Sequence, residues 1–398
     1  MQGKGPRYGW IPALDGIRGL AILMVMVFHY TIELDRSNPI ALLAGALCGY
    51  GWTGVDLFFV LSGFLITGIL LESRTAENYF SSFYMRRLLR IFPAYYISLG
   101  LILFVLPMMN PSGSRMLPSA HDRWMYAFYA QNWIGIFHYS AQNVLTPYWS
   151  LAVEEQFYLI WPLVVARFAG EKLLRIIGVI CIATMLLRFG CMAAGIHPVA
   201  IYVNTLTRMD SLLIGAACAV AVRDPRRVES LRRYARWLWL APFGAFLGVR
   251  LISSPSSKTM DPVVQGVGFT AIALSYAGLL LATVLGGNPV LQQFLSSRPM
   301  RALGKYSYAA YLWHFAAMPI VRSTIPAHVH VGGVWRMLLM GATTAVLSVS
   351  SYYLIERWFL LLKKKFEPRL PAIAPTPTPS QLATYTAAAR FAQESARR

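Results

Sequence analysis

Two side chains able to do chemistry stand inside the first apolar stretch of the sequence, GIRGLAILMVMVFHY. They are Arg18 and His29, eleven residues apart. On a helix this separation is about 16 Å along the axis and about three turns, so both side chains leave nearly the same face. An ionisable side chain in a membrane span is costly, which favours a functional role. A guanidinium can bind phosphate and a neutral imidazole can accept a proton, so the pair predicts an anion anchor and a general base.

Carboxylates in other apolar stretches could orient this base. The predicted topology places Glu154, in YWSLAVEEQFYLIWP, and Asp56, before LFFVLSGFLIT, toward the outer side of the membrane with His29. We therefore expect His29 to be polarised by a carboxylate, by Glu154 first and by Asp56 second. Arg208 and Asp210 in LTRMDSLLIG share this depth. The alternative for all these charges is a buried ion-pair network that fixes helix packing.

A second group of cations stands in the short sequence MRRLLR. Arg86 and Arg90 are four residues apart and would share a helix face, with Arg87 adjacent. Positive charge that only sets membrane topology is one interpretation. The other is a phosphate site completed by Arg18, since arginines offer bidentate donors to phosphate oxygens. The distance from this group to His29 matches a pantetheine arm, so a coenzyme A thioester could bind its nucleotide here and present its acyl group to the base.

The composition determines the class of protein that must position these groups. Of 398 residues, 56% are hydrophobic and only 13% are charged, and the mean hydropathy is +0.49. Long apolar stretches recur along the chain, which predicts an all-α polytopic membrane bundle. The net charge of +19 lies in short clusters between these stretches, which favours cytoplasmic loops over nucleic-acid binding. The four cysteines show no paired spacing, so we expect neither a disulfide framework nor a metal site.

Hydropathy and charge together predict about ten transmembrane helices with both termini in the cytoplasm. We interpret the aromatic stretch 123–139 as an interfacial or re-entrant helix, because counting it as a crossing would put a basic cluster outside. Residues 1–365 form the predicted membrane domain, and 366–398 a disordered cytoplasmic tail rich in Pro, Ala and Thr. The expected spans are 11–33, 51–72, 90–108, 148–168, 173–194, 202–222, 237–252, 263–285, 303–322 and 333–361.

Several motifs, taken together and in order, resemble the acyltransferase-3 family of integral membrane acyltransferases. They run from about residue 8 to 362 and are LDGIRGLAILMVMVFH, DLFFVLSGFLIT, FYMRRLLRIFPAYY, YWSLAVEEQFYLIWP, RMDSLLIG, GKYSYAAYLWHF and YYLIERW. The resemblance implies about ten membrane helices. It also implies transfer of an acyl group, most often acetyl, from cytoplasmic acyl-CoA to a hydroxyl. Family acceptors include cell-envelope glycans, lipid-linked sugars and small molecules. Acyl-CoA would be a co-substrate, with no permanently bound cofactor.

The same resemblance implies roles for particular residues. Arg18 and His29 correspond to the family's essential Arg–His pair, and the arginines of MRRLLR to its basic motif that contacts the donor. Glu154 corresponds to the Glu of its Trp-Ser-Leu motif. The residues expected to bind the acceptor are Trp149, Ser150, Arg208 and Asp210.

Three further expectations complete the interpretation. Many family members carry a C-terminal periplasmic domain, often of the SGNH esterase type. Here a short tail follows the last apolar stretch, so we expect a stand-alone enzyme of the bacterial inner membrane, acting directly or through a separate periplasmic partner. An acyl-enzyme on His29 or Ser62 is the alternative mechanism, and we interpret His314 as a hydrogen-bonded core histidine. A transporter or flippase for a glycan or lipid-linked sugar is the alternative function.

Overall fold

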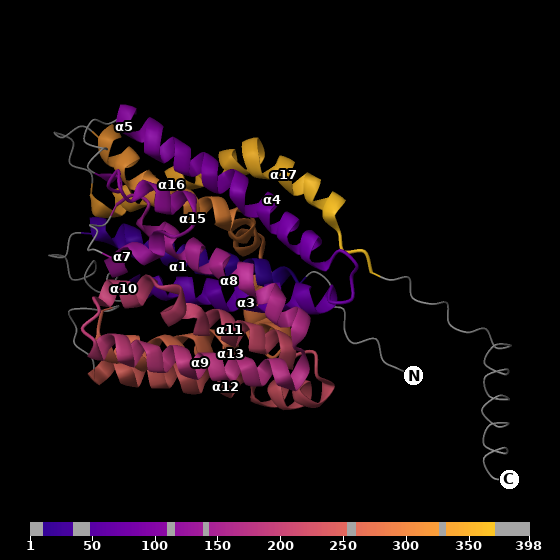
Figure 1. Cartoon of the computed structure of the whole chain (residues 1–398). Helices are drawn as coiled ribbons and strands as arrows, with labels where there is room; N and C mark the ends of the chain where they lie inside the picture. Colours follow the sequence, from indigo (N-terminus) through magenta and orange to yellow (C-terminus); the bar gives the residue numbers. More distant parts are fainter. Residues whose placement is uncertain are drawn as a thin grey trace, which may run out of the picture.

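The computed structural model describes residues 11–34, 48–109, 116–137, 143–252, 260–325 and 332–370. Within these ranges all regular structure is helical and there is no strand, so the all-α prediction is confirmed. Most of the predicted tail, residues 371–398, lies outside the described residues. The longer helices run side by side as a bundle, with α7 and α10 at its left end in the view of Figure 1.

The first half of the chain forms the helices that contribute most to both cavities described below. They are α1 (Pro12–Tyr30), α3 (Gly54–Glu72), α4 (Tyr79–Gly100), α5 (Leu106–Met109), α6 (Arg123–Ala127), α7 (Ile134–Phe137), α8 (Trp149–Arg167) and α9 (Gly170–Ala193). Two single turns precede helices of this set, namely Gly51–Thr53 before α3 and Thr146–Tyr148 before α8.

The second half adds one side of the bundle and the helix α15, which returns to pack along α1. Its helices are α10 (Pro198–Val203), α11 (Thr205–Ala221), α12 (Pro225–Ile252), α13 (Phe269–Val284), α14 (Pro289–Leu295), α15 (Arg298–Thr324), α16 (Gly333–Ser351) and α17 (Arg357–Leu362). A final turn, Lys363–Phe366, follows α17.

Six helical stretches in the described part of the chain are long and apolar enough to cross a membrane. A seventh is added if the chain from Pro198 to Tyr234, bent by 117°, counts as one span. The protein is therefore a multi-pass membrane protein. Each of the ten expected ranges overlaps a helix, but the count of ten crossings is not confirmed. Helices such as α8 and α15 contain polar and charged residues that lower their hydropathy. The membrane side of each terminus stays a prediction.

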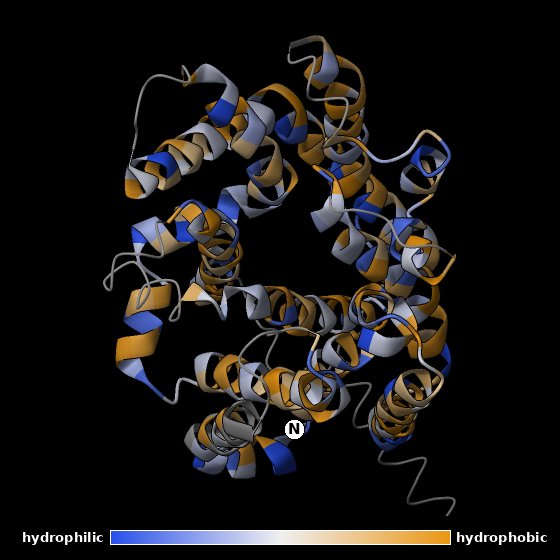
Figure 2. Cartoon of the chain, turned by 90° about the vertical axis from the view of Figure 1, so that its left-hand side faces the viewer, coloured by the Kyte–Doolittle hydropathy of each residue, from blue (hydrophilic) through white to orange (hydrophobic). Residues whose placement is uncertain are grey.

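The outer surface of the bundle is apolar, as expected for contact with lipid. On α9 only Leu173, Ile177, Thr184 and Arg188 are buried, and large aliphatic side chains such as Val179 are exposed. Hydrophobic residues predominate on most helices when the bundle is viewed from its left-hand end (Figure 2). This inverts the pattern of a soluble helix, in which the outward face is polar.

Helix α4 begins about three turns earlier than the sequence indicated. We expected a span from residue 90, whereas the helix starts at Tyr79 and includes the whole basic motif. Its start is anchored by the chain after α17 (Figure 1). Asn78 donates to the carbonyl of Glu367 (3.1 Å) and accepts from the amide of Arg369 (2.7 Å). The first residues of the predicted tail are therefore held against the bundle.

Glycines set how closely the central helices approach each other. A Cβ at Gly63 of α3 would overlap the carbonyl of Leu212 on α11, and a Cβ at Gly215 would overlap that of Val60. The same relation joins α1 to α15, where Gly304 packs on the backbone of Asp15. Small residues at membrane-helix crossings allow such close backbone packing. These contacts fix α1, α3, α11 and α15 relative to one another.

The aromatic stretch 123–139 does not form a spanning helix in its described part, residues 123–137. It consists of α6, a turn and α7, with the backbone of Tyr129 in the left-handed region at φ 54°. Gln156 of α8 donates to the Tyr129 carbonyl (2.7 Å) and to Asn132 (2.9 Å). The stretch thus folds back against the bundle and contributes to the larger cavity.

Candidate active site

Two adjacent cavities lie inside the bundle. The first, of about 320 Å³, is lined by His29, Trp52, Trp149 and residues of α6, α7 and α10. The second, of about 90 Å³, is lined by three arginines and two glutamates, namely Arg18, Arg87, Arg90, Glu154 and Glu155, together with Ser62, Tyr158 and other residues of α3, α4, α8 and α15.

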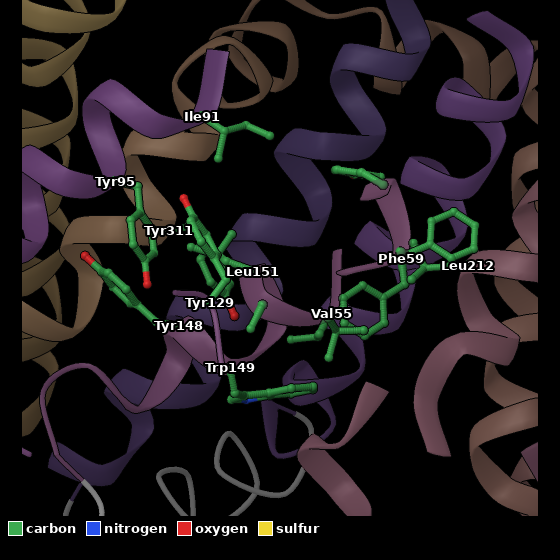
Figure 3. Close-up of a cluster of buried hydrophobic side chains, with 14 of the residues drawn as sticks. Val55, Phe59, Ile91, Tyr95, Tyr129, Tyr148, Trp149, Leu151, Leu212 and Tyr311 are labelled. Carbon is green, nitrogen blue, oxygen red and sulfur yellow. The ribbon is translucent and has the colours of Figure 1, made fainter. Parts of the chain in front are cut away.

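Val55 and Tyr311 line both cavities and therefore form the wall between them. Val55 of α3, Trp149 of α8 and Tyr311 of α15 belong to the cluster of buried side chains drawn in Figure 3. The hydroxyl of Tyr311 lies 2.5 Å from that of Ser150 and donates to the carbonyl of Pro147 (2.9 Å). Hydrogen bonds thus hold the tyrosine in its position in the wall.

Helix α1 reaches both cavities. Arg18 lines the second and His29 lines the first. The two residues, expected about 16 Å apart on one face of the helix, therefore lie in different cavities. One is the cationic cavity and the other contains the histidine. Arg18 is oriented by Asp15, one turn earlier, at 2.9 Å.

His29 is paired with a second histidine and not with a carboxylate. Its Nδ1 lies 3.2 Å from Nε2 of His314, and the two ring centroids are 5.1 Å apart. Nδ1 of His314 lies 2.8 Å from the carbonyl oxygen of Tyr311. His314 is fully buried and hydrogen-bonded, as the sequence predicted, but its partner is the candidate base. Phe315 packs edge-on against the His29 ring.

Glu154 lies with the arginines instead of with His29. It lines the second cavity and accepts a hydrogen bond from Ser62 at 2.5 Å. The expected common depth of Glu154 and His29 is therefore wrong. The start of α8 already lies deep in the bundle, since Trp149 lines the first cavity, and Glu154 follows more than one turn further along.

Asp56 is likewise separated from His29. It forms a fully buried ion pair with Arg208 at 2.7 Å and accepts from Ser211 at 3.0 Å. The Arg208 guanidinium also lies 4.0 Å from the ring centroid of Phe269. The residues that line the two cavities do not include Asp56 or Arg208. For these two the structure agrees with the alternative, an ion pair that fixes helix packing.

A second buried ion pair accounts for Asp210. It lies 2.9 Å from Arg188 of α9 and accepts from Thr270 of α13 at 2.7 Å. Arg188 also donates to the carbonyls of Thr207 and Gly266. Asp210 thus joins three helices and is not among the cavity-lining residues.

The arginine motif turns a different pair toward the cavity than expected. Arg87 and Arg90, three residues apart, line the second cavity, whereas Arg86 does not. The guanidinium of Arg87 lies over the ring of Tyr158, 5.6 Å from its centroid. The i, i+4 relation of Arg86 and Arg90 indicated a shared face, but i, i+3 neighbours also share one, and the rotation of α4 selects Arg87.

The expected acceptor residues divide between the two cavities. Trp149 lines the first and packs against Tyr202, with ring centroids 5.0 Å apart. Ser150 lines the second and holds Tyr311. Arg208 and Asp210 lie in the ion pairs described above.

Sequence reasoning missed Tyr311 and Tyr202 as cavity residues and did not connect His314 to His29. A signal existed in each case, because a polar side chain in the middle of an apolar stretch needs a partner. The sequence could not identify these partners, since they belong to different helices and His29 and His314 are 285 positions apart.

Comparison with known proteins agrees with the motifs. Residues 11–353 match the family described as "Acyltransferase domain". YrhL of Bacillus subtilis is 31% identical over 380 residues, which are 90% of this chain and 56% of YrhL. The O-acetyltransferase OatA of Staphylococcus aureus is 30% identical, over 88% of this chain and 57% of OatA. The peptidoglycan O-acetyltransferase OatA of Listeria monocytogenes is 28% identical, over 87% of this chain and 55% of that protein.

The chain thus spans about half the length of the curated relatives it matches. No solved structure matches it. The family match extends from the start of α1 to the last turns before α17 and includes every residue named at the two cavities. The chain therefore belongs to the acyltransferase-3 family.

Proposed function

We propose that this chain transfers an acyl group, acetyl in the first instance, from acyl-CoA to a hydroxyl group of a cell-envelope glycan. One observation carries the proposal. A single helix, α1, presents Arg18 to a cationic cavity and His29 to a larger cavity beside it. An acyl donor with an anionic nucleotide and a slender arm fits two such cavities, because the nucleotide can bind the arginines while the arm carries the acyl group toward His29.

The second cavity is the proposed donor site. Arg18, Arg87 and Arg90 would bind phosphate groups of coenzyme A through charged hydrogen bonds. The arm would then lie past Tyr308 and reach the wall formed by Val55 and Tyr311. Displacement of the Tyr311 ring would bring the thioester to His29.

The chemical step assigned to His29 is general base catalysis. Its imidazole accepts the proton of the acceptor hydroxyl as the oxygen attacks the thioester carbonyl carbon. The C–O bond forms and the C–S bond breaks, and the coenzyme A thiolate takes the proton back from the imidazolium. The acyl group passes directly to the acceptor oxygen and the proton passes to the thiolate, so no acyl-enzyme forms. Neither Glu154 nor Asp56 takes part in the proton transfer.

The lining of the first cavity supports a sugar acceptor. It combines the aromatic rings of Trp52, Trp149 and Tyr202 with the amides of Gln131 and Asn143. Aromatic faces can stack on sugar rings, while amides bind hydroxyls in defined directions. The Listeria relative is named for peptidoglycan, which makes a wall glycan the first acceptor to test. The family assignment does not favour the alternative of a transporter or flippase.

Donor binding is the first measurement. The chain, purified in detergent, is heated with coenzyme A, acetyl-CoA and longer acyl-CoAs, since a ligand that binds the native state raises the unfolding midpoint. We expect a saturable increase that is lost in Arg87→Ala/Arg90→Ala and kept in Arg226→Ala, since Arg226 is exposed and does not line either cavity. Folded protein whose midpoint does not change with any thioester would contradict the donor assignment.

Transfer is measured next with radiolabelled acetyl-CoA and membranes that contain glycan precursors. We expect label in an alkali-labile ester on glycan, absent with His29→Ala. Label recovered only on a separate protein would mean that this protein, and not the glycan, is the direct acceptor.

A further inference from the structure

We propose that His314 is a positioning residue that fixes the tautomer of His29, so that Nε2 of His29 carries the lone pair presented to the acceptor. The inference rests on the proposed function, in which His29 is the base, and names the group that orients it. It begins from the two hydrogen bonds that join His29, His314 and the backbone of Tyr311.

The direction of the first bond is set by chemistry. A backbone carbonyl oxygen only accepts, so the 2.8 Å contact between Nδ1 of His314 and the Tyr311 oxygen requires a proton on Nδ1. In a neutral imidazole the other nitrogen is then unprotonated. Nε2 of His314 is therefore an acceptor.

The second bond follows from the first. Nε2 of His314 lies 3.2 Å from Nδ1 of His29 and can only accept, so Nδ1 of His29 must donate. A neutral His29 with its proton on Nδ1 leaves Nε2 free to accept. His29 lines the first cavity, so the free nitrogen belongs to the ring that meets the acceptor.

If His314 were cationic, its Nε2 would carry a proton and donate to Nδ1 of His29, which would reverse the direction of this hydrogen bond. The surroundings of His314 disfavour the charge. The residue is fully buried, and within the described part of the chain neither histidine forms an ion pair with a carboxylate. An unpaired charge in such a site is strongly unfavourable. The neutral relay therefore accounts for both contacts.

The helix backbone holds His314 in place independently of the ring contacts. The hydroxyl of Tyr30, the residue after His29, donates to the carbonyl of His314 (3.0 Å) and contacts the hydroxyl of Thr344 (2.6 Å). Two consecutive residues of α1 thus bind residue 314 of α15, one through its ring and one through its backbone. The close packing of Gly304 on α1 fixes the same pair of helices.

The role resembles that of the acid in a Ser-His-Asp triad, which selects a tautomer and stabilises the imidazolium. Here a neutral ring replaces the acid. Without it the His29 ring keeps only its hydrogen bond to the backbone carbonyl of Val25 and loses the side-chain acceptor on α15. The other tautomer, protonated on Nε2, cannot take the proton of a hydroxyl at that nitrogen.

Kinetics of matched variants test the role. His314→Leu removes the acceptor, whereas His314→Gln places an amide oxygen near the former Nε2. We expect kcat to fall at least tenfold in His314→Leu and to recover to within about threefold of wild type in His314→Gln, with the donor KM unchanged in both. His121→Leu, at an exposed site outside the cavities, should match wild type. Equal losses in the Leu and Gln variants, or full activity in His314→Leu, would overturn the inference.

The tautomer can also be measured without turnover. Nitrogen and carbon chemical shifts of labelled histidine distinguish the two neutral forms, and the seven histidines are assigned by comparison with His29→Ala and His314→Gln. We expect His29 protonated on Nδ1 in wild type and on Nε2 in His314→Leu. Wild-type His29 protonated on Nε2 would refute the relay even if His314→Leu failed to fold.

The two proposals fail separately. If His29→Ala retained transfer while the wild-type tautomer was as expected, the base assignment would be wrong and the relay would remain. If His29→Ala abolished transfer while His314→Leu left the tautomer unchanged, the base would remain and the role of His314 would be wrong.

Discussion

The hydroxyl of Tyr311 lies 2.5 Å from the hydroxyl of Ser150, and this contact holds the aromatic ring that separates the cationic cavity from the histidine cavity. The proposed transfer requires a thioester to pass this ring. In the proposed mechanism, Tyr311 therefore stands between the donor site and the acceptor site.

Tyr311→Phe should loosen this wall. The variant loses the hydroxyl that binds Ser150 and Pro147, at a cost in stability of about 1 kcal/mol for each of the two hydrogen bonds. We expect hydrolysis of acetyl-CoA to increase relative to transfer, because the freed ring excludes water less well from the first cavity. Free coenzyme A and esterified product are measured in parallel. An unchanged ratio of the two would show that the hydroxyl does not control passage.

His29→Ala should abolish transfer and leave donor binding intact. The ring lines the first cavity, whereas the proposed phosphate contacts are made by the arginines of the second. The thermal shift with coenzyme A measures donor binding, and ester formation measures transfer. Residual transfer at the wild-type rate would remove the imidazole from the mechanism.

Arg87→Ala/Arg90→Ala should raise the donor KM at least tenfold. Each charged hydrogen bond contributes about 1.5–3 kcal/mol, and both side chains line the second cavity. Arg86→Ala is compared with the single variant Arg87→Ala, because each removes one positive charge from the same helix. Arg86 lies outside the cavity lining, so its effect should be clearly smaller. A larger effect at Arg86 than at Arg87 would mean that charge alone, and not contact, sets donor affinity.

Asp56→Asn should destabilise the protein without acting on the chemistry. The substitution leaves the fully buried Arg208 without its counter-charge, and breaking a buried pair costs about 3–5 kcal/mol. We expect a lower unfolding midpoint, with near-normal kcat in the fraction that remains folded. Asp56→Asn/Arg208→Met should recover part of the stability, because both charges are removed together. A selective loss of kcat in fully stable Asp56→Asn would restore the catalytic role predicted from the sequence.

Gly63→Ala should separate α3 from α11. Any Cβ at this position overlaps the Leu212 carbonyl, so the helices must move apart, and Ser62 would shift from Glu154 with them. Gly178→Ala is the matched control, since a Cβ there meets open space and alanine is a better helix former by up to about 1 kcal/mol. Thermal unfolding in detergent should show a clear loss for the first variant and no loss for the second. Equal stability of both would mean that the crossing tolerates a wider spacing.

The sequence by itself determined the relations that lie within one helix. The spacing of Arg18 and His29 placed both on one face of α1, because the rise and turn per residue are properties of the backbone. Composition likewise determined the membrane class, since apolar stretches of this length have few other stable environments.

Only the tertiary structure decided which charged or polar groups meet. Arginines and carboxylates on several helices are compatible with many pairings, and the sequence could not choose Arg208 for Asp56 or Arg188 for Asp210. The depth of a residue also depends on how far inside the bundle its helix starts. Helix α8 begins at Trp149, almost as expected, but Trp149 already lines the first cavity, and Glu154 therefore lies with the arginines of the second.

The pairing of His29 with His314 required both helices at once. The two residues are 285 positions apart and belong to α1 and α15, so no local pattern relates them. Their contact depends on the rotation and axial offset of two helices, which are set by the glycine contacts along the crossing and by the hydrogen bond from Tyr30 to the His314 carbonyl. Backbone geometry placed each ring on its helix, and close packing between helices made the two rings a pair.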